Sequence, residues 1–155
     1  MPTFATLCYL LREDKVLLLR KAHGLFGEGK WNAPGGKLLI GELPETGAAR
    51  EMNEETGQSV SALRFHGILN FYLGEAKEID QTVFVFSCKK SSGEMRNSRE
   101  GELQWFPLSQ IPYGEMWQDD KVWLPFVIEG KNFIGDFCFT ANYGELVSCK
   151  MHQVR

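Results

Sequence analysis

The distribution of apolar and polar positions predicts strands at both ends of the chain and helices between them. Residues 4–11 and 16–20 form apolar, β-compatible runs, and the polar link 12–15 between them is typical of a hairpin turn. A helix is predicted over 44–56, because proline suits the first turn of a helix and Gly57 can adopt the left-handed conformation that ends one.

Further strands and a second helix are predicted downstream. Residues 82–89 form a nearly continuous run of β-branched and aromatic residues, as expected of a strand buried on both faces. A helix is predicted over 119–129, which Pro125 must kink or shorten. The other predicted segments are a glycine-rich loop at 24–41, strands at 60–73 and 104–108, an exposed loop at 91–102, and a closing hairpin of 133–140 and 145–151. This order predicts a mixed α/β fold with helices packed on a partly antiparallel sheet.

Composition changes this picture little. The 155 residues suit a single domain, 1–155, and a 43% hydrophobic, 24% charged composition is that of a globular protein. The formal net charge of −3 argues against binding to a nucleic acid polymer or to an anionic membrane, since both require a positive surface. A small anionic substrate is compatible with that charge, because a bound cation inverts the local field.

The cysteines and the N-terminus carry little information about function. The four cysteines are scattered without a C-x-x-C pair or a histidine cluster, so we expect no zinc or iron–sulfur site. The first residues lack a basic segment before an apolar one, and no apolar run approaches the length of a membrane span. We therefore expect a soluble protein of the reducing cytoplasm. The sequence predicts no oligomeric state.

Two glycine-containing segments are candidates for phosphate chemistry. The first, residues 24–30, has the spacing of a P-loop, but Trp31 stands where a Ser or Thr hydroxyl should reach Mg²⁺, and no helix follows. We therefore reject a P-loop. The second segment runs from Gly36 through Glu42 to the helix at 44–56.

The predicted helix presents a cluster of carboxylates. Glu51, Glu54 and Glu55 are spaced i, i+3 and i+4, so they share one face, near a helix C-terminus where the macrodipole disfavours negative charge. A hard cation, Mg²⁺ or Mn²⁺, would relieve the repulsion. The alternative is a solvated acidic face in which Arg50 pairs with Glu54.

At this point the sequence resembles the Nudix family. The box G-x5-E-x7-R-E-U-x-E-E-x-G-U is matched by an apolar residue, Met52, and by seven fixed residues: Gly36, Glu42, Arg50, Glu51, Glu54, Glu55 and Gly57. The one departure is Gln58 in the final apolar slot, which we expect to affect the packing of the loop after the helix. The resemblance implies an α/β/α sandwich with a mixed sheet and Mg²⁺-dependent hydrolysis of a nucleoside diphosphate linked to another group.

The resemblance also implies roles for individual residues. Metal ligands would be the Gly36 carbonyl and the carboxylates of Glu51, Glu54, Glu55 and a glutamate from a later loop. We predict Glu100 for that last ligand, with Glu102 as the second choice. Arg50 would orient a ligating carboxylate. Glu55, Glu54 and Glu100 all remain candidates for the general base.

Beyond the box, the chain is similar to MutT-type enzymes that hydrolyse oxidised purine nucleoside triphosphates. The similarity lies in residues 26–37 and 111–125, where Gln118 replaces the proline of a W-P-D-D segment, so that we expect a less rigid loop. It implies that Asn32, Asp119 and Asp120 bind the purine edge and that Trp117 stacks on it. The pocket would be shaped by Thr6, Leu7, Phe26, Phe71, Leu73 and Trp123, with Leu73 standing where an aromatic residue is usual.

Simpler interpretations exist for the same residues. Asp119 or Asp120 stands where a helix begins and is a natural N-cap, while Trp117 and Trp123 could be core aromatics. Lys21 and Lys37 are either phosphate contacts or solvated lysines. Adjacent carboxylates, however, can keep a proton, so an Asp pair can donate and accept hydrogen bonds at once.

We therefore predict a cytoplasmic Nudix hydrolase that binds a small nucleotide and cleaves oxidised purine nucleoside triphosphates, such as 8-oxo-dGTP or 2-oxo-dATP, to monophosphate and pyrophosphate. One alternative is a Nudix hydrolase of ADP-ribose or a diadenosine polyphosphate, the latter hinted at by Tyr72; another is a non-catalytic nucleotide-binding domain. Residues 42–55 hold five glutamates and one arginine, a local charge of −4, so the rest of a chain with net charge −3 carries +1. The acidity is concentrated in the proposed metal site.

Overall fold

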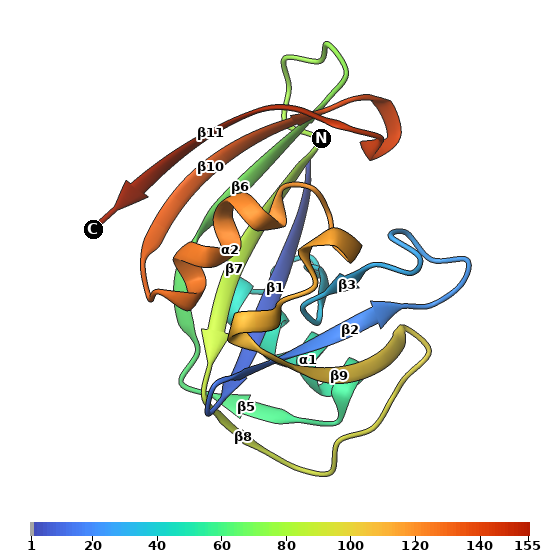
Figure 1. Ribbon diagram of the computed structural model, residues 1–155, viewed down its shortest axis with the longest axis vertical. Coiled ribbons are helices and arrows are strands. Elements are labelled where there is room, and N and C mark those ends of the chain that lie inside the picture. The colour runs from blue at the N-terminus through green and yellow to red at the C-terminus, as the bar shows by residue number, and fades with distance from the viewer. Residues whose placement is uncertain (1) are drawn as a thin grey trace.

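The computed structural model describes residues 2–155 and contains a mixed sheet flanked by helices (Figure 1). In chain order its strands and helices are β1 (Thr3–Arg12), β2 (Lys15–Lys21), β3 (Trp31–Asn32), β4 (Gly35–Lys37), α1 (Pro44–Thr56), β5 (Ser59–Ser61), β6 (Arg64–Leu73), β7 (Gln81–Cys88), β8 (Lys90–Ser92), β9 (Gly101–Pro107), α2 (Asp120–Ile128), β10 (Asn132–Phe139) and β11 (Leu146–Val154). Three short 3₁₀ turns are η1 (Leu108–Gln110), η2 (Tyr113–Glu115) and η3 (Ala141–Tyr143).

The sheet is mixed, as predicted. Its nine strands run in the order β11-β10-β6-β7-β1-β2-β3, with β4 also paired to β1 and β9 to β2. The pairs β1–β7 and β6–β10 are parallel and the others are antiparallel. The predicted hairpins β1–β2 and β10–β11 are both present. Strands β5 and β8 form a separate antiparallel pair.

The two helices cover opposite faces of the sheet. Successive residues of a strand point to opposite sides, so Cys8 and Leu10 of β1 pack with Met52 of α1, while Tyr9 packs with Trp123 of α2. In Figure 1 α2 lies in front of the strands and α1 lies behind them. The predicted α/β/α arrangement is therefore confirmed.

Helix α1 has the predicted bounds because its local signals are strong. Pro44 lies in its first turn, and Gly57 ends it at φ 80°, with its N–H donating to the Asn53 carbonyl 2.9 Å away. Gln58, the departure from the box, is buried, and its amide donates to the Gly93 carbonyl at 2.8 Å. A polar side chain is accommodated there because this hydrogen bond offsets its burial.

Four predicted segments need correction. The strand predicted over 60–73 is two strands, β5 and β6, because the chain turns at Ala62, which has φ 54°. The loop predicted over 24–41 includes β3 and β4, which its glycine content concealed. The loop predicted over 91–102 overlaps the end of β8 and the start of β9, which its polar content concealed. Helix α2 contains Pro125 and is one residue shorter at each end than predicted. Within residues 2–155, no helix is both long and apolar enough to cross a membrane.

Candidate active site

Strand β4 brings the glycine loop against α1, and two glycines make this approach possible. A Cβ on Gly36 would lie 2.7 Å from a Glu51 carboxylate oxygen, and one on Gly35 would lie 1.9 Å from the Thr6 carbonyl. Both distances are too short for a side chain. Gly35 is therefore required for β4 to pair with β1, because the Thr6 carbonyl belongs to the backbone, whereas a side chain at position 36 would displace the Glu51 carboxylate.

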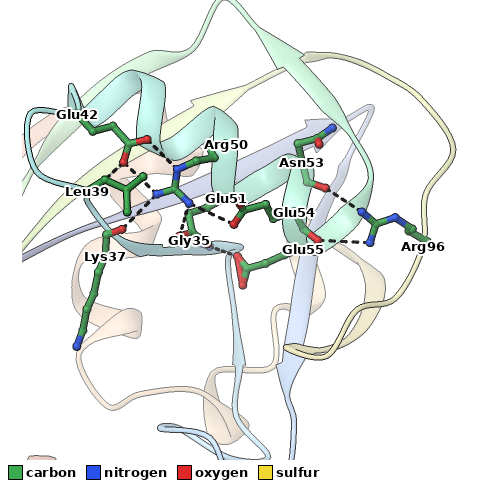
Figure 2. Close-up of polar contacts among 10 residues, drawn as sticks. All are labelled: Gly35, Lys37, Leu39, Glu42, Arg50, Glu51, Asn53, Glu54, Glu55 and Arg96. Carbon is green, nitrogen blue, oxygen red and sulfur yellow. Dashed lines mark hydrogen bonds and ion pairs between the residues drawn. The ribbon is translucent and has the colours of Figure 1, made fainter.

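Arg50 organises the acidic cluster of α1 (Figure 2). Its guanidinium donates to both oxygens of Glu42, from Nε at 2.7 Å and from Nη2 at 3.0 Å, and Nη1 donates to Glu51 at 2.9 Å and to Glu54 at 3.2 Å. The bidentate pair lowers the pKa of Glu42 to about 2. The Arg50–Glu54 pair expected of a solvated acidic face is present, but it is the longest of the four contacts that Arg50 makes to carboxylates. Arg50 thus holds carboxylates from two segments in fixed positions.

Glu55 and Glu51 point inward from the same helix. Glu55 is only 3% exposed, and one of its oxygens accepts a hydrogen bond from the Gly35 N–H at 2.8 Å. Burial, with further contributions from the charges of Glu51 and Glu100, raises its pKa to about 8. Burial also raises the pKa of Glu51. Burial outweighs the Arg50 contact at Glu51, and Glu55 forms no salt bridge among residues 2–155, so a bound cation would favour the ionised form of both groups.

Glu100 approaches this cluster from the segment before β9. Its carboxylate pairs with Lys21 Nζ at 2.8 Å, and its charge contributes to raising the pKa of both Glu51 and Glu55. Glu102 lies within β9 opposite Arg20 and is exposed. Of the two glutamates considered from the sequence, Glu100 is thus the one that faces the cluster. Lys21 lines a cavity that begins beside this cluster and is described below, whereas Lys37 is exposed.

The donor chemistry of this cluster suits a hard divalent cation, since it offers carboxylate oxygens and a glycine carbonyl. Within residues 2–155, no three acidic, histidine or cysteine side chains converge on a single point, because Glu51 and Glu54 turn toward Arg50 and Glu100 toward Lys21. The residues thus fit a metal in type and charge, while the individual ligand set stays a prediction.

A cavity of about 170 Å³ begins at this cluster. Glu55, Gly35, Gly36 and Lys21 line one part of it. It is also lined by residues that the sequence assigned to a base pocket: Thr6, Leu7, Phe26, Asn32, Phe71, Trp117, Asp119, Asp120 and Trp123. Leu73 is not among the lining residues. One cavity therefore joins the acidic cluster to the predicted base-binding residues.

Sequence analysis missed several lining residues: Lys30, Gln81, Phe139 and Tyr143. They come from different loops and strands, and of the four only Lys30 belongs to a segment that the sequence singled out, the glycine-containing stretch 24–30. Tyr143 stands in a segment predicted only as a hairpin turn, and nothing about its residue type signals a cavity position.

The two aspartates are buried in the cavity wall. Asp119 and Asp120 are 3% and 2% exposed. Asp119 precedes α2, but its side chain makes no capping hydrogen bond and instead accepts one from the Trp123 indole N–H at 2.7 Å. Burial raises the pKa of Asp119 to about 6, and burial together with the charge of Asp119 raises the pKa of Asp120 well above its usual value. The capping interpretation is therefore wrong for Asp119, and burial of both carboxyls favours their protonated forms.

Two polar atoms in the cavity wall lack partners within residues 2–155. They are the Asp120 Oδ2 atom and the Thr6 hydroxyl oxygen, both fully buried. An unpaired buried polar group costs about 1–3 kcal/mol.

Aromatic rings line the rest of the cavity near these aspartates. Phe26, 63% exposed, stacks on Trp117 with ring centroids 5.0 Å apart. Phe139 meets Trp117 edge-on at 6.4 Å, and the Lys30 ammonium lies 5.2 Å from the Trp117 ring centroid. Trp123 is fully buried and contributes mainly to the core, which agrees with its interpretation as a core aromatic. Flat ligands that carry polar edges match such a wall.

The geometry, a glycine loop packed on a glutamate-rich helix beside an aromatic cavity, is that of a nucleotide hydrolase. A model of the NUDIX domain matches residues 1–127. The chain belongs to the Nudix family.

Similar proteins agree with this assignment. The chain is 42% identical over 135 residues to the oxidized purine nucleoside triphosphate hydrolase of Mus musculus, covering 86% of this chain and 85% of that protein. It is 38% identical over 150 residues to the protein of the same name from Danio rerio, covering 96% and 94%. The crystal structure of the mutator MutT protein from Bacillus halodurans superposes with a TM-score of 0.86 at 31% identity, covering 96% of this chain and 97% of that one. Nudix hydrolases generally use a divalent metal and act on small nucleotide substrates.

Proposed function

We propose that this protein hydrolyses oxidised purine nucleoside triphosphates, such as 8-oxo-dGTP or 2-oxo-dATP, to the monophosphate and pyrophosphate, and so removes them from the nucleotide pool. The observation that carries the proposal is the single cavity that joins the Glu55 end to the buried pair Asp119 and Asp120. The names of the Mus musculus and Danio rerio relatives support the same substrate class.

The acidic end would hold the triphosphate. Glu51, Glu54, Glu55, Glu100 and the Gly36 carbonyl are the proposed ligands of Mg²⁺, with Mn²⁺ as an alternative. When bound, the metal supplies charge neutralisation and an activated water for in-line attack on phosphorus. Arg50 keeps Glu51 and Glu54 in position through its 2.9 and 3.2 Å contacts. Lys21, at the cavity wall, adds positive charge for the phosphates.

The base end would read the purine edge. With one proton shared by two adjacent carboxyls, Asp120 donates a hydrogen bond while Asp119 accepts one, and exchanging the proton reverses the pattern. Oxidised guanine and oxidised adenine present different donor patterns, and such a pair accommodates both. Asn32, which also lines the cavity, would contribute an amide contact. Trp117 and Phe26 supply the ring contacts.

The test is a panel of oxidised and unmodified purine nucleoside triphosphates, with ADP-ribose and a diadenosine polyphosphate, each incubated with the protein and Mg²⁺ and scored for product. We expect pyrophosphate and the monophosphate from the oxidised purine triphosphates at the highest kcat/KM. Preferred cleavage of ADP-ribose or a diadenosine polyphosphate would overturn the substrate assignment. Binding without turnover of any compound would favour a nucleotide-binding domain instead.

The metal assignment has its own control. The same panel without divalent metal, after treatment with a chelator, should yield no product, and adding back Mg²⁺ should restore it. Full activity after chelation would contradict the proposed metal site. The cytoplasmic location and the single domain over 1–155 stay predictions.

A further inference from the structure

Tyr143 lies on η3, between β10 and β11, in an uncommon backbone conformation. Asn142 and Tyr143 have φ of 59° and 56°, in the left-handed region that bulky side chains rarely adopt. The turn is closed on both sides, since Thr140 N–H donates to the Glu145 carbonyl and Glu145 N–H donates to the Thr140 hydroxyl, each at 2.8 Å. A strained turn persists only where surrounding contacts hold it.

The ring of Tyr143 completes an aromatic wall of the cavity. Its centroid lies 5.5 Å from Phe26, 6.0 Å from Trp117, 5.5 Å from Phe139 and 6.2 Å from Phe71, at interplanar angles of 55–73°. These separations are those of edge-to-face aromatic pairs. Tyr143 therefore contacts both rings that form the Phe26–Trp117 stack.

The hydroxyl of Tyr143 is engaged by a residue that is not among those lining the cavity. It donates to the Asp80 carboxylate at 2.7 Å, and Asp80 is itself held by a hydrogen bond from its N–H to the Phe71 carbonyl at 2.8 Å. Burial and the Asp80 carboxylate raise the pKa of Tyr143, so the phenol stays a neutral donor. With its hydroxyl engaged, Tyr143 offers the cavity a ring.

A second tether joins this turn to the segment that carries Trp117 and the aspartates. The Gln118 amide donates to the Glu145 carboxylate at 2.9 Å, and its oxygen accepts from the Leu146 N–H at 2.6 Å. We expected Gln118, in place of a proline, to leave this loop less rigid; the structure instead shows its side chain bridging two loops. These two hydrogen bonds thereby hold the Tyr143 turn and the Trp117 loop in a fixed relative position.

We propose that Tyr143 is a substrate-binding residue that contacts the purine of the nucleotide, and that Gln118 is a positioning residue that holds Tyr143 against Trp117. The inference rests on the proposed function for the identity of the nucleotide. Because a ring contact does not depend on the donor pattern of the base, Tyr143 contributes binding to every purine alike. The Asp119–Asp120 pair, in contrast, distinguishes among purines.

The test compares Tyr143→Ala, Tyr143→Phe, Gln118→Leu and the control Tyr72→Ala, whose side chain does not line the cavity. The measurements are kcat and KM for 8-oxo-dGTP and dGTP with Mg²⁺, and the thermal unfolding midpoint of each variant. Loss of a base–aromatic contact raises KM about tenfold, and Tyr143→Ala should do so for both substrates with kcat nearly unchanged. Tyr143→Phe, which keeps the ring but loses the Asp80 bond, should raise KM about threefold.

The remaining variants separate binding from structure. Gln118→Leu should raise KM by less than Tyr143→Ala, and Tyr72→Ala should leave it unchanged. An unchanged KM in Tyr143→Ala, or equal losses in the Ala and Phe variants, would overturn the proposal. A fall in kcat with constant KM would do so too.

A binding measurement keeps this test independent of the proposed reaction. Calorimetric titration of 8-oxo-dGMP requires no turnover, and Tyr143→Ala should weaken that binding about tenfold while Tyr72→Ala does not. If the wild type hydrolyses no purine triphosphate yet shows this pattern, the reaction assignment fails and the Tyr143 assignment stands. If hydrolysis occurs and Tyr143→Ala binds 8-oxo-dGMP normally, the Tyr143 assignment fails and the reaction assignment stands.

Discussion

The two ends of the cavity both bury carboxylates, but they differ in what balances the charge. At the acidic end, Arg50 binds Glu42, Glu51 and Glu54, and Lys21 binds Glu100. At the base end, Asp119 and Asp120 form no salt bridge within residues 2–155, and the only side-chain donor to either is the Trp123 indole.

This difference indicates two uses of the same side chain. Carboxylates paired with cations are stabilised in the ionised form, whereas burial without a cation favours the protonated form. Glu55 at the acidic end is also buried without a salt bridge among residues 2–155, which raises its pKa to about 8, but it lies beside the ion-paired carboxylates with which it would share a metal ion. The acidic end is thus suited to metal and phosphate, and the base end to hydrogen bonding with a neutral base. The following predictions test whether the two ends act separately.

The largest expected effect is at the acidic end. Glu54→Gln should lower kcat about 10²–10⁴-fold, because an amide cannot supply the charge of a metal ligand or act as a general base. The fold should survive, since the Glu54 side chain is 58% exposed. Steady-state kinetics and circular dichroism check both statements. Glu45→Gln, an exposed glutamate at the start of the same helix, is the matched control; near-normal turnover in Glu54→Gln would refute the metal assignment.

A smaller effect is expected from the residue that positions these carboxylates. Arg50→Lys should lower kcat/KM about 10–100-fold, because a lysine ammonium cannot reproduce the bidentate contact to Glu42 while also reaching Glu51 and Glu54. The apparent Mg²⁺ affinity, from activity titrations, should fall in parallel. Arg96→Lys provides a comparison, since within residues 2–155 the Arg96 guanidinium donates only to backbone carbonyls of the same helix. Equal losses in the two variants would remove the special role of Arg50.

At the base end the expected change is one of preference. Asp119→Asn should alter the ratio of kcat/KM for 8-oxo-dGTP to that for 2-oxo-dATP by roughly tenfold, because the amide fixes a donor pattern that the proton pair can exchange. Competition assays with both nucleotides measure this ratio directly. A ratio that matches the wild type would leave Asp119 as a structural partner of Trp123.

The last effect is on stability rather than on catalysis, and it depends on pH. The pKa of Asp119 is raised in the folded state to about 6, so its favourable contribution is full below about pH 4 and is lost as pH rises through 6. Asp119→Asn has no carboxyl to ionise, so it avoids this loss of stability. As pH rises from 4 to 8, the free energy of unfolding of the variant should therefore increase relative to that of the wild type, on the order of 3 kcal/mol. Asp120, Tyr9 and Tyr143 are the titratable groups nearest to Asp119, and none introduces a cation. Urea unfolding at both pH values measures the difference; a pH-independent difference would contradict the buried-proton account.

The two ends also differ in how far the sequence predicts them. The acidic end follows from local rules, since i, i+3 and i+4 spacing places Glu51, Glu54 and Glu55 on one helix and Pro44 and Gly57 mark its bounds. The resemblance to the Nudix family added Gly36 and Glu100, and the structure places both beside the cluster. Residue spacing did not predict the bidentate contact between Arg50 and Glu42, because that contact joins the helix to the loop before it.

The base end could be predicted only through resemblance, because its residues come from β1, the 24–30 loop, β6, the segment before α2, and η3. Tyr143 has no counterpart in any motif, and its position depends on a left-handed turn at Asn142 that residue type alone does not specify. The break at Ala62 between β5 and β6 escaped prediction for the same reason. Tertiary contacts rather than local propensity determine these conformations.

The most direct test of the account is a single matrix of kcat/KM values. The substrates are 8-oxo-dGTP, 2-oxo-dATP, dGTP and dATP, and the proteins are wild type, Glu54→Gln and Asp119→Asn, all with Mg²⁺. We predict that Glu54→Gln lowers all four values by a common factor, whereas Asp119→Asn changes their ratios. If Glu54→Gln changes the ratios, or Asp119→Asn lowers every value equally, the division of the cavity into a phosphate end and a base end is wrong.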